Sequence, residues 1–163
     1  QPPVMTGTLE EIWPPSGLVV ESGDLRMTAL READVPEVLD VVAGGIHDPS
    51  WTPFAFPWTD APAEEIPANY MRFFASTLAR TQGGGASIEL VVRRGGRVVG
   101  VQAMNGADVA GSRRMETGRG QAERRGMPTT DVFFELRPDE FVRGDDPVRI
   151  TGADELRRFL GLT

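Results

Sequence analysis

Two runs of branched apolar residues, joined by Gly95 and Gly96, dominate the middle of the chain. The first run, 87–94, reads Ser-Ile-Glu-Leu-Val-Val-Arg-Arg, and the second, 97–105, begins Arg-Val-Val-Gly-Val. Valine, isoleucine and leucine at this density favour strands, and two glycines suit the positive φ angles of a two-residue hairpin loop. We therefore predict an antiparallel hairpin. Because both arms are almost continuously apolar, we expect it inside a sheet that is covered on both faces.

The chain before this hairpin has the pattern of two short strands followed by a helix. Apolar residues at 18–20 and 25–30 flank a Ser-Gly-Asp turn, which predicts a pair of strands. Asp34 is a suitable helix N-cap, and Glu37 follows three residues later as its capping-box partner. We expect this helix to end at the glycine pair 44–45. The residues predicted on its buried face are Val35, Val38, Leu39, Val42 and Ile46.

A second helix is predicted from about Glu64 or Pro67 to Arg80. Its apolar residues recur at helical spacing, which indicates one buried stripe. The members of that stripe are Ile66, Tyr70, Phe73, Phe74, Thr77 and Leu78. Tyr70 is the only tyrosine, and its place on the stripe favours a core position.

The rest of the chain carries strand patterns and one short helix. We expect strands at 112–118, 132–136 and 148–151, a helical turn at 138–139, and a helix over 154–160 with Leu156, Phe159 and Leu160 inward. The pattern predicts an α+β fold, with a mixed, mostly antiparallel sheet flanked by helices. We expect one domain over residues 5–163, with Met5 as the natural start and Gln1–Val4 left over from expression.

Composition removes several classes of function. The 163 residues include no cysteine and one histidine, which excludes disulfides, thiolate metal sites, a cysteine nucleophile and a multi-histidine metal site. All 17 basic residues are arginine, which excludes a lysine nucleophile and indicates a GC-rich bacterial genome. A net charge of −7 argues against nucleic-acid and anionic-membrane partners. No apolar run approaches the ~18 residues of a membrane span, so we expect a cytoplasmic protein without a metal.

Four motifs follow one another along the chain in an order that resembles that of a known protein family. They are Met27-Thr-Ala-Leu-Arg-Glu-Ala-Asp34, Pro53-Phe-Ala-Phe-Pro-Trp-Thr-Asp-Ala-Pro62, Val99-Gly-Val-Gln102 and Glu116-Thr-Gly118. Together they resemble the GNAT superfamily of acyl-CoA N-acyltransferases, and in particular its ribosomal-protein-type N-acetyltransferase branch. The Pro-Phe…Pro-Trp-Thr-Asp block is the more specific part, whereas the hairpin is generic to the superfamily. The resemblance covers about residues 5–118 and, more weakly, 127–163.

The resemblance implies acetyl-CoA as the acyl donor and a small-molecule or peptide amine as the acceptor. In such proteins the strand at 114–118 pairs with the pantetheine arm, and amides at the start of the next helix hold the pyrophosphate. The residues that this assigns to the donor are Arg114, Met115, Thr117, Gly118, Arg119 and Gly120. An alternative for the nearby arginines is a solvated loop.

Glu116 is the catalytic candidate that the resemblance implies. An amine must lose its ammonium proton before it can attack a thioester, and a carboxylate beside the acetyl group can take that proton. The alternative is a glutamate at a strand edge, in solvent or paired with Arg113 or Arg114.

The resemblance also assigns the proline- and aromatic-rich segment 47–62 to one wall of the amine groove. The candidate substrate-binding residues are His47, Trp51, Phe54, Phe56 and Trp58. Alternatively, the aromatic side chains plug the end of the sheet, and His47 caps helix carbonyls.

The chain departs from the family pattern after Gly118. A glycine-rich loop and a helix should follow, but Arg119-Gly-Gln-Ala-Glu-Arg-Arg-Gly126 has no helical periodicity. The family core therefore looks incomplete between about residues 118 and 127. A deletion, a degenerate paralogue or omitted residues would each explain this.

Two functions remain open at this level. The first is N-acetylation of a primary amine by direct attack on acetyl-CoA. The second is a non-catalytic or truncated binding or dimerisation module of the same fold. A homodimer is a candidate assembly because a cut core exposes strand edges.

Overall fold

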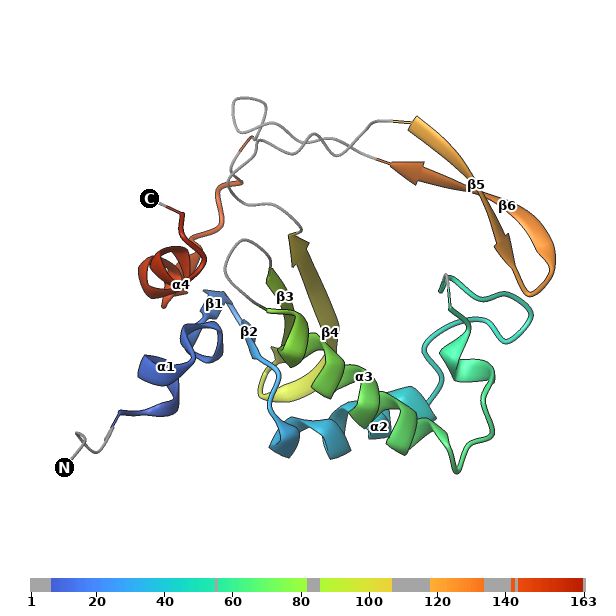
Figure 1. Ribbon diagram of the computed structural model, residues 1–163, viewed down its shortest axis with the longest axis horizontal. Coiled ribbons are helices and arrows are strands. Elements are labelled where there is room, and N and C mark those ends of the chain that lie inside the picture. The colour runs from blue at the N-terminus through green and yellow to red at the C-terminus, as the bar shows by residue number, and fades with distance from the viewer. Residues whose placement is uncertain are drawn as a thin grey trace.

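The computed structural model describes residues 7–54, 56–81, 86–106, 118–133, 142 and 144–162. Its helices are α1 (Leu9–Ile12), α2 (Val35–Ala43), α3 (Ile66–Arg80) and α4 (Ala153–Phe159), with 3₁₀ turns η1 (Pro14–Gly17), η2 (Glu32–Asp34) and η3 (Trp58–Asp60). Its strands are β1 (Val19–Ser22), β2 (Leu25–Ala29), β3 (Ala86–Arg94), β4 (Arg97–Gly106), β5 (Gly118–Arg124), β6 (Met127–Phe133) and β7 (Arg149–Thr151). Helices and strands share one fold (Figure 1), so the predicted α+β class is confirmed.

Five of the described strands form one sheet in the order β4-β3-β2-β1-β7. Every described pair in it is antiparallel, with Val20 opposite Met27 and Met27 opposite Val92. The mostly antiparallel sheet is therefore confirmed, and the described part of it contains no parallel pair. The predicted turn at Ser22-Gly23-Asp24 joins β1 to β2, and Gly23 takes φ 58° there.

The central hairpin forms as predicted, but its second arm lies in a different environment from the one expected. Gly95 and Gly96 have φ 54° and 83°, which are the positive angles that the two-residue loop requires. β3 is interior, whereas β4 is the outer strand of the described sheet. Val99 is 53% exposed and Met104 is 44% exposed. The expectation of an interior second arm is wrong for the described residues, because an apolar run reports propensity and not which strand lies beside it.

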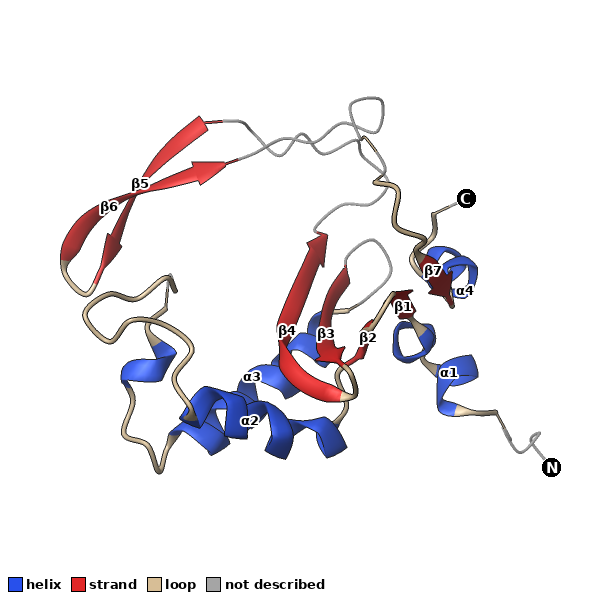
Figure 2. Cartoon of the chain, turned by 180° about the vertical axis from the view of Figure 1, so that it is seen from behind, coloured by secondary structure: helices blue, strands red, loops and turns tan. Residues whose placement is uncertain are grey.

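Adjacent residues of β3 point into two separate cores. Val91 packs with residues of α2 and α3, and Leu90 packs with residues of α4. Since side chains alternate across a strand, α2 and α3 cover one face of the sheet and α4 covers the other (Figure 2). β3 is therefore the strand that both layers share.

The acidic start of α2 binds the sheet instead of closing a capping box. Asp34 accepts the backbone N–H of Arg31 at 2.9 Å and pairs with Arg93 at 2.8 Å. Glu37 accepts the N–H of Val98 at 3.0 Å, and this bond holds the pKa of Glu37 below its ordinary value. The predicted capping box is wrong because both carboxylates find partners on the β3–β4 hairpin.

The stripe predicted on α3 is only partly buried. Tyr70, Phe74 and Thr77 are buried, as expected. Phe73 and Leu78, however, are 47% and 41% exposed. The helix packs on β3 along one narrow face, so apolar residues at the margins of the stripe stay in solvent.

The C-terminal segment closes against the N-terminal one. β7 pairs with β1, and α4 buries Leu156 and Leu160 as predicted. The rings of Trp13 and Phe159 meet edge to face with centroids 5.2 Å apart. Gly152, at φ 80°, precedes α4 and lies directly against the backbone of Gly17.

β5 and β6 form a separate antiparallel hairpin that extends away from the five-stranded sheet (Figure 1). Its turn is Arg125-Gly126, with φ 52° and 74°. The strand predicted at 132–136 begins earlier, at Met127, because residues 127–133 pair with β5.

Candidate functional site

The residues predicted to hold the acyl donor fall in two groups. Arg114, Met115, Glu116 and Thr117 lie outside the described residues. Gly118, Arg119 and Gly120 lie in β5, where they pair with Phe133, Val132 and Asp131. A strand offers its amides to a neighbouring strand and does not converge them on an anion as a helix N-terminus does. The described backbone at 118–120 therefore does not fit the pyrophosphate cradle that the resemblance implies.

The predicted acceptor residues are only partly brought together. His47 meets Phe54 edge to face at 5.6 Å between centroids, and Phe54 lies 5.5 Å from Trp58. Trp58 continues the contact to Tyr70 of α3 at 5.9 Å. We call this row the aromatic ladder; it joins segment 47–62 to the core beneath α2 and α3. Trp51 and Phe56 stand apart from these ring contacts and are 50% and 78% exposed.

Both ring nitrogens of His47 are used within the segment itself. Nδ1 lies 2.8 Å from the carbonyl oxygens of Asp48 and Trp51, and Nε2 lies 2.8 Å from the hydroxyl of Thr59. Two carbonyl partners require Nδ1 to carry a proton, and in the neutral ring Nε2 then accepts from the Thr59 hydroxyl. This arrangement fixes the segment and leaves the imidazole without a free nitrogen for an amine.

Asp48 also serves the local backbone. Its carboxylate accepts the backbone N–H of Ser50 at 2.8 Å and the hydroxyl of Ser50 at 2.7 Å. These bonds keep the pKa of Asp48 below its ordinary value, with the hydroxyl contributing most. His47-Asp48 is thus built as a turn in the described geometry.

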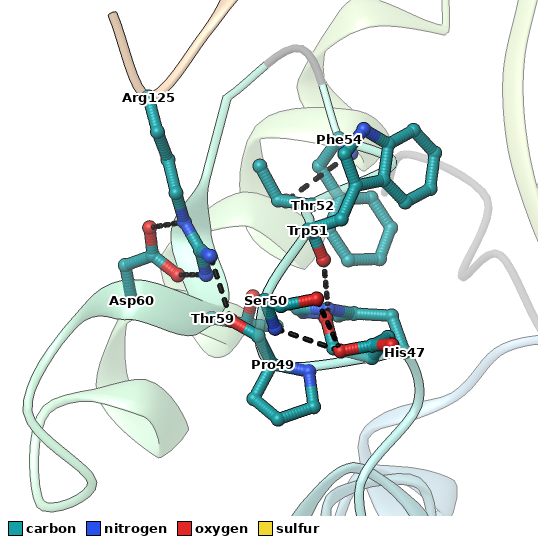
Figure 3. Close-up of polar contacts among 10 residues, drawn as sticks. His47, Pro49, Ser50, Trp51, Thr52, Phe54, Thr59, Asp60 and Arg125 are labelled. Atoms are coloured by element: carbon teal, nitrogen blue, oxygen red, sulfur yellow. Dashed lines mark hydrogen bonds and ion pairs between the residues drawn. The ribbon is translucent and has the colours of Figure 1, made fainter. Parts of the chain in front are cut away.

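Arg125 at the tip of the β5–β6 hairpin reaches back to this segment (Figure 3). Its Nε donates to Asp60 at 2.6 Å, a second nitrogen donates to the other oxygen of Asp60, and Nη1 donates to the carbonyl of Pro49 at 2.8 Å. A two-pronged contact of this kind matches the planar fork of arginine. The backbone of Arg125 has a left-handed φ of 52°, a conformation that L residues disfavour.

Replacing Arg125 should release the hairpin from segment 47–62. We expect Arg125→Ala to speed proteolysis within both segments, while Arg125→Lys keeps the charge but loses the fork and gives an intermediate rate. The Arg125 hydrogen bonds hold the pKa of Asp60 below its ordinary value of 3.8. The protection should therefore be complete above pH 3.8 and be lost as the pH falls through the lower folded-state pKa. Limited proteolysis across a pH series measures this, and equal rates for all three proteins at pH 7 would contradict it.

A cavity of about 850 Å³ lies elsewhere, between α1 and η1, the end of β2, the C-terminal half of α3 and the start of β3. No described residue of segment 47–62 lines it. Its walls are largely apolar and include Trp13, Leu30, Phe74, Leu78 and Ile88. Its volume lies within the range of small-molecule pockets, which is roughly 300–1,000 Å³.

Glu89 brings a carboxylate to this cavity. The residue is only 8% exposed, on the α3 side of β3. Burial raises the pKa of Glu89, and Arg80 partly opposes that rise. Burial also raises the pKa of Tyr70, to about 12, with a smaller contribution from the charge of Glu89. Among the residues that the structure describes, none donates a hydrogen bond to the Glu89 carboxylate or forms an ion pair with it.

Sequence reasoning missed both Glu89 and the Arg125–Asp60 contact. Glu89 carried a usable signal, because an acid inside an otherwise apolar strand is rarely buried without a partner or a ligand. The contact between Arg125 and Asp60 joins positions far apart in the chain, and no local pattern marks it.

Within 7–54, 56–81 and the later described ranges, no three of the histidine, aspartate and glutamate side chains are grouped so as to hold a metal ion. None of the helices in the described ranges has the length and apolar character needed to cross a membrane. No model of a known protein family matches the chain.

Proposed function

We propose that this chain is a GNAT-type domain that serves acetyl-CoA-dependent N-acetylation of a primary amine, and that the described part is its acceptor side. The supporting observation is the order of β2, two helices, β3 and β4, with β2, β3 and β4 antiparallel neighbours and both helices on one face. That order is the one that the sequence resemblance implies. The donor side depends on residues 107–117 and on a helix that the described residues after Gly118 do not supply.

The strand pairing of β5 favours a second candidate function, a binding module without catalytic activity. Gly118–Gly120 are engaged in strand pairing, and His47 is engaged within its own segment. These engagements agree with a non-catalytic module, which keeps the acceptor side and binds an amine without transferring an acetyl group. The two candidates differ in whether the chain binds acetyl-CoA.

Calorimetry with acetyl-CoA and the full 163-residue chain separates these functions. For the enzyme we expect saturable heat, and release of free coenzyme A thiol once a primary amine is added. Heat without saturation, or none, overturns the enzyme and leaves the binding module.

A pair of variants tests the candidate base. Glu116→Gln should lower the rate of thiol release by about 100-fold at unchanged acetyl-CoA affinity, which is typical for loss of a general base. Glu123→Gln removes an exposed carboxylate from nearby β5 and should change neither quantity. Equal rates of thiol release for both variants would exclude Glu116 as the general base.

A further inference from the structure

The cavity beside β3 combines apolar walls with one buried acid. Leu30, Phe74 and Ile88 are each at most 5% exposed and line it together with Trp13. At its β3 side lies Glu89, which is 8% exposed. Its carboxylate oxygens are not fully enclosed, so a ligand in the cavity can reach them. A cation or a donor bound there would stabilise the carboxylate, because a charge that has lost most of its water is costly.

The hydroxyl groups at the cavity already have partners. Thr81 donates its hydroxyl to the carbonyl of Ser87 at 2.7 Å, and the Ser87 hydroxyl lies 2.7 Å from the Asn105 side chain. Thr77 donates to the carbonyl of Phe73 at 3.1 Å. Two described carboxylates line the cavity, and of these Glu32 is exposed to solvent whereas Glu89 is buried. Glu89 is therefore the buried carboxylate whose bonding capacity is left for a ligand.

The nearby cations are committed elsewhere. Arg31 pairs with Glu10 at 2.6 Å and donates to the carbonyl of Ser16. Arg80 donates to the hydroxyls of Ser76 and Thr77, and its guanidinium lies over the ring of Phe73. Arg80 acts on Glu89 through its field, and no ion pair joins these two described residues.

We propose that this cavity binds the ammonium group of a small organic amine, with Glu89 as its counter-ion and the apolar walls around its hydrocarbon part. The carboxylate fixes the charge of the ligand, and Trp13 and Phe74 favour an aromatic or branched apolar body. The volume of about 850 Å³ accommodates such a molecule. The site goes beyond the proposed function, because it is separate from segment 47–62 and requires no acetyl-CoA.

The test uses 2-phenylethylamine as the probe and 2-phenylethanol as its neutral counterpart, with the full chain and without acetyl-CoA. We expect the amine to bind saturably at pH 7, and the alcohol at least about tenfold more weakly. Phe-Ala-Ala amide distinguishes a free amine from a peptide N-terminus: equal binding extends the ligand class to peptides, and weaker binding assigns the site to free amines. Equal binding of amine and alcohol, or no binding of either, overturns the proposal.

Two variants locate the effect. Glu89→Gln should weaken amine binding about tenfold and leave the alcohol unchanged. Glu64→Gln removes an exposed charge outside the cavity and should leave both unchanged. An amine that binds Glu89→Gln as tightly as the natural chain places the site elsewhere and overturns the proposal.

The pH dependence gives a second measurement. The titratable residues that line the cavity are Glu89 from β3, Glu32 from η2 and Arg31, which caps η2. Arg80 and Tyr70 of α3 do not line it but lie near enough for their charges to interact with that of Glu89. Because burial raises the folded-state pKa of Glu89 above 4.5, the charged form destabilises the empty fold at neutral pH. We expect Glu89→Gln to melt above the natural chain at pH 7, with the difference vanishing below pH 4.5. A lower melting temperature for the variant at pH 7 would show that Glu89 has a stabilising partner within the fold, which overturns its assignment as the ligand's counter-ion.

The outcome does not depend on the acetyltransferase proposal. Amine binding without acetyl-CoA binding supports this site and overturns the proposal that the chain is an acetyltransferase. Acetyl-CoA binding without amine binding in this cavity does the reverse.

Discussion

Gly152→Ala should destabilise the fold by roughly 3 kcal/mol, through a left-handed φ and a steric clash together. Gly152 has φ 80°, and a Cβ built there would lie 2.3 Å from the carbonyl oxygen and 2.7 Å from the carbonyl carbon of Gly17. Both atoms are backbone, so no side-chain rotation can relieve the overlap. The chain would have to separate α4 and β7 from η1. Urea unfolding followed by circular dichroism measures the loss.

Gly161→Ala is the matched control for this prediction. Gly161 has a similar φ of 74° at the other end of α4, but nothing lies within 4 Å of its added Cβ. Gly161→Ala should therefore lower the free energy of unfolding only by the cost of a left-handed φ in alanine, about 1 kcal/mol. Equal losses for the two alanine variants would mean that the close approach to Gly17 does not exist in solution.

Phe74→Ala should cost about 3–5 kcal/mol, the usual range for deleting a buried phenylalanine ring. Phe74 is 4% exposed and packs among residues of α2, α3, β3 and β4 in the larger core. Removing it also opens the wall of the cavity beside Glu89. Thermal and urea unfolding both report the loss.

The neighbouring residue provides the comparison. Phe73 is 47% exposed and lies beneath the Arg80 guanidinium at 5.8 Å. Phe73→Ala should cost less than about 1 kcal/mol, the value of an exposed cation–π contact. If the Phe73 variant proved the less stable of the two, α3 would have to be rotated on the sheet relative to the structure.

These adjacent phenylalanines show how far local patterns predict the fold. Helical spacing placed both on one stripe, and it located α3 and Tyr70 correctly. The width of the buried stripe depends on what packs against the helix, which is a tertiary property. The same limit explains β4, whose valines predict a strand but not its place at the outside of the described sheet.

The candidate site was less predictable than the fold. Phe54 and Trp58 were candidates because the resemblance assigns segment 47–62 to the amine groove, yet their rings contact each other and Tyr70 in the aromatic ladder. His47 was a candidate as part of the same segment, but its bonding is set by carbonyls that become neighbours only when the segment turns. Glu89 became a candidate once the walls of its cavity were known, and those walls come from four separate parts of the chain.

The pairing of β7 with β1 has a consequence for synthesis on the ribosome. β1 emerges well before its partner Arg149–Thr151, because 126 residues separate Ser22 from Arg149. Until then one edge of β1 has free amides and carbonyls, and contacts this distant in sequence form slowly. The nascent chain is therefore exposed to wrong strand pairing until β7 has been made. A chaperone that binds extended segments would act at Val19–Ser22 during that interval.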